Sequence, residues 1–138
     1  MALLNGSKKI KTAVFISGNG SNLKSLIKFS KIKKTPISVN LIISNNAKSK
    51  GLHYGSIYKI KKKIFNFKNR SLAEKKILKE LKKNKINLVC LAGFMKILSK
   101  KFIKNFKGKI LNIHPSLVPK FKGLNTHRRA IKNKEIYS

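Results

Sequence analysis

The chain of 138 residues has 34 lysines and arginines, three acidic residues and a formal net charge of +31. This length suits one compact domain with its own core and excludes two. No apolar run approaches the roughly 18 residues that cross a bilayer, and the apolar start of the chain is too short for a signal peptide. The single cysteine, Cys90, cannot form an internal disulfide, so we expect a cytoplasmic protein.

Short β-branched runs alternate with amphipathic stretches along the chain. The runs predict strands at residues 12–17, 37–44, 63–67, 86–92 and 109–113. The stretches predict helices from Ser21, near 48–58, from a capping box at Ser71 to about Asn84, from Ser99, and near 126–134. Strands that alternate with helices indicate an α/β fold, with an open, mostly parallel, twisted sheet and helices on both faces.

Ligands of open α/β sheets bind beyond the carboxyl ends of the strands. The loops at 18–22, 93–98 and 112–119 all follow predicted strands, so they should converge on one edge of the molecule. This edge is where we expect the functional site.

The first of these loops, Gly18 to Asn22, joins a predicted strand to a predicted helix. Its glycines allow a tight turn and close approach of a ligand, and the free N–H groups at a helix start attract an anion. It lacks the dinucleotide fingerprint, because Leu23 occupies the third glycine position and no acid lies near residue 40. The loop fits a single phosphate better than NAD. An ordinary turn between strand and helix is the equal alternative.

Asn112 and His114 lie two residues apart around the end of the last predicted strand, so they should point to the same side. An amide and an imidazole can together stabilise an oxyanion and transfer a proton. Pro115 restricts the backbone of His114 to extended conformations. This position favours catalysis over a histidine that merely binds a carbonyl in the core.

Other candidates carry less chemistry. For the apolar loop at 93–98, composition favours packing, and the alternative is a slot for a flat heterocycle. Cys90 lies in an apolar run and is expected to pack in the core. The chain has no aspartate and no cluster of His, Cys and acidic residues with ligand spacing, so neither a Ser-His-Asp triad nor a metal site is expected.

Four segments of the chain resemble the phosphoribosylglycinamide formyltransferases of purine biosynthesis. They are residues 16–23 (ISGNGSNL), 91–99 (LAGFMKILS), 111–119 (LNIHPSLVP) and 123–128 (GLNTHR). The match runs in order from about Lys11 to the last residue. The resemblance implies a Rossmann-like formyltransferase domain at residues 11–138, after an N-terminal extension at 1–10.

The resemblance also implies a reaction and its residues. A formyl group passes from 10-formyltetrahydrofolate, the co-substrate, to the amine of glycinamide ribonucleotide, without a metal. By this resemblance Gly20, Ser21 and Asn22 bind the ribonucleotide, and Asn112 and His114 are catalytic. The implied folate-binding residues are Arg70, Met95, Lys96, Ile97, Leu98 and Asn112.

The chain departs from the family mainly in length. Family members continue beyond it with further strands and an aspartate that pairs with the catalytic histidine, whereas this sequence stops at Ser138 and Glu135 is no evident substitute. An imidazolium without its carboxylate is less favoured at neutral pH. We therefore expect ligand binding at the loop of residues 18–22 to survive and turnover to be weak or absent.

Two other functions stay open as alternatives. One is a related enzyme with similar motifs at its strand ends, either a formyltetrahydrofolate hydrolase or a methionyl-tRNA formyltransferase. The other is a basic nucleic-acid-binding protein, whose affinity would fall steeply with salt. We do not expect nucleic acid as the partner, because the lysines are spread along the whole chain and only three residues are arginine. Codon bias toward A and T would explain much of the basicity.

Overall fold

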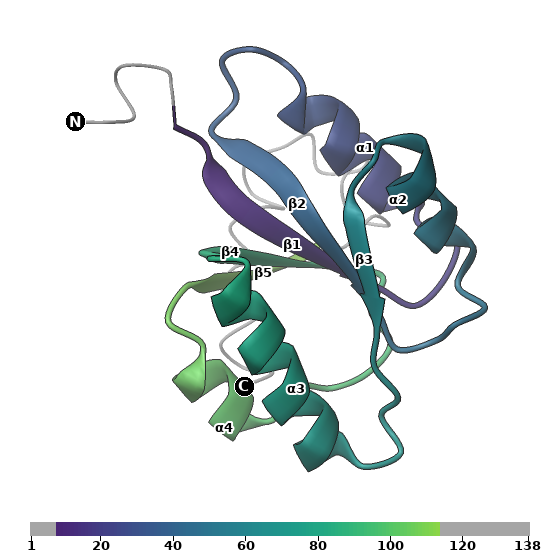
Figure 1. Ribbon diagram of the computed structural model, residues 1–138, viewed down its shortest axis with the longest axis vertical. Coiled ribbons are helices and arrows are strands. Elements are labelled where there is room, and N and C mark those ends of the chain that lie inside the picture. Colours follow the sequence, from purple (N-terminus) through teal and green to yellow (C-terminus); the bar gives the residue numbers. More distant parts are fainter. Residues whose placement is uncertain (1–7, 114–138) are drawn as a thin grey trace.

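The computed structural model describes residues 8–113, which form a parallel sheet with helices on both faces (Figure 1). The strands are β1 (Ile10–Ile16), β2 (Ile37–Ser44), β3 (Lys61–Ile64), β4 (Leu88–Ala92) and β5 (Lys109–Ile113). Their order is β3-β2-β1-β4-β5, and each neighbouring pair is parallel. The predicted α/β class is confirmed.

The helices connect successive strands. They are α1 (Ser21–Ser30), the 3-10 helix η2 (Lys50–Leu52), α2 (His53–Ile57), α3 (Arg70–Lys83) and α4 (Lys100–Asn105). The single helix predicted near 48–58 is thus two short pieces, η2 and α2. Among residues 8–113 no helix is long and apolar enough to cross a membrane. The helix predicted near 126–134 lies outside the described residues.

An apolar layer lies on each face of the sheet, and β1 contributes to both. Ala13 and Phe15 belong to the layer under α3 and α4, whereas Val14 and Ile16 belong to the layer under α1 (Figure 1). All four side chains are fully buried. A strand covered on both faces has a continuous apolar sequence, which is why the run at 12–17 was recognisable as a strand.

The edge strand β3 begins two residues before its predicted start. Its sequence is Lys-Lys-Lys-Ile, and all four residues are exposed. Lysines on an edge strand discourage pairing with another chain, but they also hide the strand from an apolar pattern. The apolar pattern therefore predicts this strand too late in the chain, at 63–67.

The predicted capping box at Ser71 is wrong. Helix α3 is capped two residues earlier by Asn69, whose side-chain oxygen accepts from the N–H of Leu72 at 3.0 Å. Glu74, the expected partner in that box, instead turns toward α4 and binds Ser99. Helix α4 starts directly after Ser99, close to its predicted start, and Ser99 caps it, because its hydroxyl accepts from the N–H of Phe102 at 3.1 Å.

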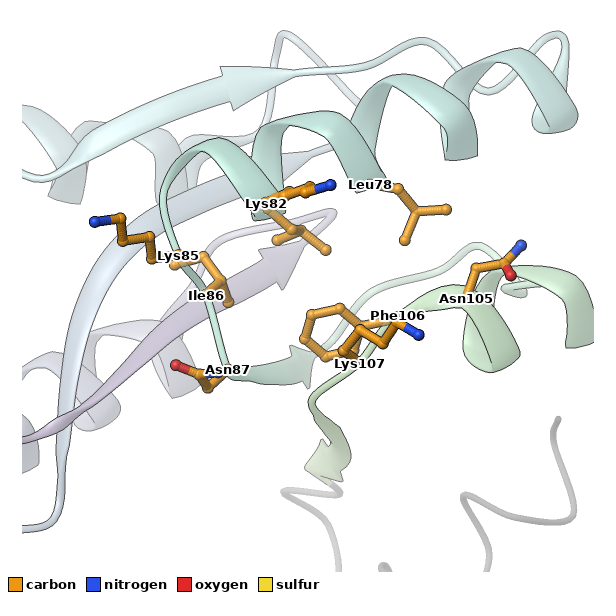
Figure 2. A pocket seen from close by; sticks show the side chains of 9 residues that line it. Leu78, Lys82, Lys85, Ile86, Asn87, Asn105, Phe106 and Lys107 are labelled. Atoms are coloured by element: carbon orange, nitrogen blue, oxygen red, sulfur yellow. The ribbon is translucent and has the colours of Figure 1, made fainter.

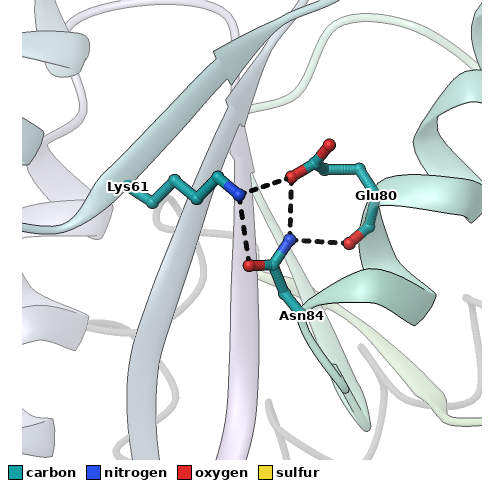
Figure 3. A network of polar contacts seen from close by, with 3 residues as sticks. All are labelled: Lys61, Glu80 and Asn84. Atoms are coloured by element: carbon teal, nitrogen blue, oxygen red, sulfur yellow. Dashed lines mark hydrogen bonds and ion pairs between the residues drawn. The ribbon is translucent and has the colours of Figure 1, made fainter.

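A polar network joins β3 to the end of α3 (Figure 3). Lys61 Nζ lies 3.0 Å from Glu80 Oε2, and Asn84 donates to the same oxygen at 2.8 Å. The hydrogen bond from Lys61 is the main cause that lowers the pKa of Glu80 below its ordinary value. The lysine is partly open to solvent, so the pair stabilises the fold only modestly.

Glu80→Gln should lower the free energy of unfolding by about 0.5–1 kcal/mol near neutral pH. The pKa of Glu80 is lower in the folded state. Its contribution is therefore present above the pKa of the unfolded chain and is lost as the pH falls through the folded pKa. Urea unfolding at about pH 7 and about pH 3 should show the difference between wild type and variant shrinking in acid. A difference that does not change with pH would contradict this role, and Lys61→Met should remove the same pH dependence.

Candidate active site

The candidate site lies where the strand order reverses, at the carboxyl ends of β1 and β4 (Figure 1). In open α/β sheets this reversal leaves a crevice in which ligands bind. Two loops meet there, the glycine loop (residues 18–22) after β1 and the apolar loop (residues 93–98) after β4. The N–H of Met95 donates to the hydroxyl of Ser17, directly before the glycine loop, at 2.8 Å. The predicted convergence of these two loops is confirmed.

The glycine loop makes a turn that requires glycine. Gly20 has a φ of +77°, in the left-handed region, and it precedes α1 as the cap residue. A Cβ atom on Gly20 would lie 2.7 Å from the Cα of Gly51, so the backbone of η2 also excludes a side chain. Both the conformation and the close approach therefore select glycine at position 20.

Contacts with η2 and with Ser49, the residue before it, hold the glycine loop in place. The carbonyl oxygen of Gly18 accepts from the N–H of Gly51 at 2.9 Å and from the hydroxyl of Ser49 at 2.8 Å. Asn19 Oδ1 accepts from the N–H of Ser21 at 3.2 Å. This bond occupies the first N–H of α1, and the cap residue Gly20 has no side chain that could bond to the N–H groups of Asn22 and Leu23, in contrast to the caps of α3 and α4. The first turn of α1 thus presents backbone N–H groups and the positive end of the helix dipole on a fixed loop, an arrangement suited to an anion.

The backbone of the apolar loop is fixed at three points. Its start is held by the bond from Met95 to Ser17. Arg70 Nη1 donates to the carbonyl oxygen of Ile97 at 3.4 Å. Just beyond the loop, the buried carboxylate of Glu74 accepts from the N–H and the hydroxyl of Ser99, at 2.7 and 2.6 Å. Helix α3 therefore positions the far half of the loop.

Side chains of the apolar loop lie open to solvent although its backbone is held. Met95 is 77% exposed and Ile97 is 71% exposed, the highest values for large apolar side chains among residues 8–113. Lys96 between them is also exposed, whereas Leu98 is buried in the core. Leu98 can thus offer only its backbone groups to a ligand. Exposed apolar side chains gathered on one surface mark an interaction surface or a ligand-binding groove.

The structure places one member of the predicted catalytic pair. Asn112 is half-buried in β5, in register with Leu91 of β4 and near the carboxyl end of the strand. His114 and the rest of the predicted loop at 112–119 lie outside the described residues. The geometry of the amide and imidazole pair is therefore a prediction still.

Local electrostatics favour anions at this edge. Residues 8–113 contain two acidic side chains, and both already have partners, Glu74 with Ser99 and Glu80 with Lys61.

Burial raises the pKa of the Cys90 thiol to about 11, so Cys90 stays protonated in the core as expected. In the described part of the chain no group of three or more His, Cys, Asp or Glu side chains could hold a metal ion.

A cavity of about 370 Å³ lies away from this site, between the last turn of α3 and the end of α4 (Figure 2). Its lining includes Leu78, Ile86 and Phe106 together with three lysines. The residues Ile86 and Asn87 directly precede β4, so the cavity lies at the amino ends of the strands. None of the predicted site residues lines it.

Three residues of the site could not be found from the sequence pattern. They are Ser17, Gly51 and Glu74, whose partners are 25 to 78 residues away in the chain. The only signal for Ser17 was its place directly before the glycine loop. Gly51 and Glu74 carried none, because a lone glycine and a helical glutamate are common on any surface.

Fold and site together define an open α/β protein with a glycine turn at a helix start where its strand order reverses. The chain belongs to the formyl transferase family, whose model matches residues 10–137. It is 43% identical over 125 residues to the phosphoribosylglycinamide formyltransferase of Haemophilus influenzae, covering 88% of this chain and 59% of that protein. It is 42% identical to the human trifunctional purine biosynthetic protein adenosine-3, covering 91% of this chain and 13% of that protein.

Solved structures agree with this assignment. The phosphoribosylglycinamide formyltransferase of Brucella melitensis superposes with a TM-score of 0.75 at 38% identity, covering 92% of this chain and 68% of that one. The corresponding enzyme of Anaplasma phagocytophilum has a TM-score of 0.70 at 40% identity, covering 91% and 59%. The resemblance drawn from the four sequence motifs is thus confirmed. The chain spans about three-fifths of the length of the bacterial relatives that it matches.

Proposed function

We propose that this chain transfers a formyl group from 10-formyltetrahydrofolate to the amine of glycinamide ribonucleotide, a step of purine biosynthesis. The observation that carries the proposal is the contact between the segment of the glycine loop and an exposed apolar loop at one edge of the sheet. A phosphorylated amine and a flat heterocycle are the two ligands such loops would accept. Two of the relatives that cover most of this chain are named as phosphoribosylglycinamide formyltransferases.

In this proposal the glycine loop binds the ribonucleotide. Gly20, Ser21 and Asn22 would surround its phosphate at the start of α1. The left-handed φ of Gly20 and the lack of a side-chain cap from this residue support that placement. The positive charge of the molecule would add to the attraction of a phosphate.

The apolar loop would bind the folate in this proposal. The ring would lie on the exposed side chains of Met95 and Ile97, and the backbone of Lys96 and Leu98 would read its polar edge. Arg70, which already bonds to this loop, would stand beside the folate. Asn112 would contact the formyl group.

The chemistry we propose is direct transfer. The substrate amine attacks the formyl carbon, and the formyl oxygen gains negative charge in a tetrahedral intermediate. Asn112 and a protonated His114 would stabilise that oxyanion, and a proton then passes to the leaving folate nitrogen as the carbon–nitrogen bond breaks.

We assign this activity to a domain at residues 11–138, preceded by an extension at 1–10. Its single buried cysteine suits the reducing cytoplasm.

Incubating the 138-residue chain with both substrates tests the proposal, with mass spectrometry of the products. Formylated ribonucleotide supports formyl transfer. Formate released without the amine substrate would instead assign the related hydrolase. If the chain gives neither product and binds neither ligand, the proposal is wrong. Affinity for nucleic acid that falls by powers of ten between about 50 and 200 mM salt would then favour the nucleic-acid alternative.

A further inference from the structure

The hydroxyl of Ser17 connects three segments that are far apart in the sequence. It accepts from the N–H of Met95 in the apolar loop at 2.8 Å and donates to Asn45 Oδ1, after β2, at 2.5 Å. Ser17 itself directly precedes the glycine loop. Among the described residues no other side-chain hydrogen bond joins the segment 17–22 to the segment 93–98.

The two bonds of this hydroxyl support each other. A serine hydroxyl has one hydrogen to donate, and donation to Asn45 leaves its lone pairs for the N–H of Met95. Bonds in such a chain polarise and strengthen one another. Asn45 therefore orients the hydroxyl that holds the apolar loop.

An aromatic contact reinforces the same junction. Phe94 meets Phe15 of β1 edge to face, with ring centroids 5.4 Å apart. The start of the apolar loop is thus attached to the end of β1 by one apolar and one polar contact. Of these, only the polar one lies at Ser17, the residue directly before the glycine loop.

We propose that Ser17 is a positioning residue that couples the two substrate subsites, so that each bound substrate raises the affinity for the other. The inference rests on the proposed function. A phosphate on the glycine loop restricts the backbone that follows Ser17, and the hydroxyl passes this restraint to Met95. The exposed side chains of the apolar loop then have less freedom to lose when the folate binds. Coupling of this kind is reciprocal.

The experiment measures the dissociation constant of tetrahydrofolate with and without saturating glycinamide ribonucleotide, by calorimetry without oxygen. This pair of ligands contains no formyl group and cannot react. We expect the ribonucleotide to tighten folate binding by about five- to tenfold in the wild-type chain. In Ser17→Ala this factor should fall to about one, and Ser17→Thr, which keeps the hydroxyl, should restore it.

Ser38→Ala is the matched control. The hydroxyl of Ser38 also donates to an asparagine, Asn40 Oδ1, at 2.7 Å, but Ser38 lies at the beginning of β2, at the other end of the sheet. This variant should keep the wild-type coupling factor. If Ser17→Ala fails to fold, Asn45→Ala removes the acceptor that orients the hydroxyl and should lower the factor in the same way.

The outcomes separate the two proposals. A wild-type chain that binds both ligands, with the same coupling factor in Ser17→Ala, overturns the role of Ser17 and leaves the proposed function standing. Equal loss of coupling in Ser38→Ala overturns it as well. A wild-type chain that binds neither ligand contradicts the proposed function, and the coupling with it.

Discussion

Replacing Asn112 with alanine should lower the rate of formyl transfer by about 10²–10³-fold, with much less effect on the binding of either substrate. A side-chain amide that donates to a developing oxyanion stabilises the transition state more than the ground state. Asn112 is half-buried near the end of β5, so a ligand can reach it without rearrangement of the sheet. Single-turnover rates at saturating substrate concentrations give the effect on the chemical step.

Asn105→Ala is the control for this prediction. Asn105 ends α4 and lines the remote cavity, so its loss removes an amide of the same kind without touching the candidate site. It should leave the rate unchanged. If Asn112→Ala raises the dissociation constants and leaves the single-turnover rate intact, Asn112 binds the folate and does not act in the chemistry.

Gly20→Ala should reduce both stability and ribonucleotide binding. The alanine would have to adopt a φ of +77° with its Cβ atom 2.7 Å from the Cα of Gly51. We expect a loss of about 1–3 kcal/mol in the free energy of unfolding, because neither backbone can move without breaking the bonds at Gly18. The displaced N–H groups should weaken ribonucleotide binding by at least about tenfold.

Gly18→Ala is the control that separates backbone strain at Gly20 from the mere loss of a glycine in the loop. Gly18 has no left-handed φ, and a Cβ atom there meets nothing within 4 Å among the described residues. Urea unfolding should therefore show Gly18→Ala close to wild type and Gly20→Ala clearly destabilised. Equal losses in the two variants would mean that the left-handed turn does not stabilise the loop.

The apolar periodicity of the sequence predicts the position of elements that pack their apolar residues against the core. Strand β5 lies at the predicted residues 109–113, and α1 begins at the predicted Ser21. The predicted position of strand β3 is too late in the chain because its three lysines carry no apolar pattern. The predicted cap of α3 is wrong because Asn69 and Ser71 are both residue types that cap helices. Only the packing of α3 against α4 determines that Glu74 binds Ser99 and not the start of its own helix.

The candidate site also has a part that the sequence predicts and a part that it does not. Parallel strands must end at a common edge, so topology alone brought the glycine loop and the apolar loop together. The contacts that fix them could not be predicted, because they depend on which side chain reaches which backbone atom. Ser17 with Met95 spans 78 residues, and the approach of Gly20 to Gly51 depends on how η2 packs against the loop.

The bonding of Glu74 and Glu80 has a consequence for the behaviour of this protein in salt. Residues 8–113 contain only these two carboxylates, so most lysines in this part of the chain have no described acidic neighbour to compensate their charge. Self-repulsion of like charges destabilises a compact state, and dissolved ions screen it within about 10 Å at 0.1 M. Dilute buffer should therefore be the condition in which the fold is weakest, and added salt should raise its melting temperature.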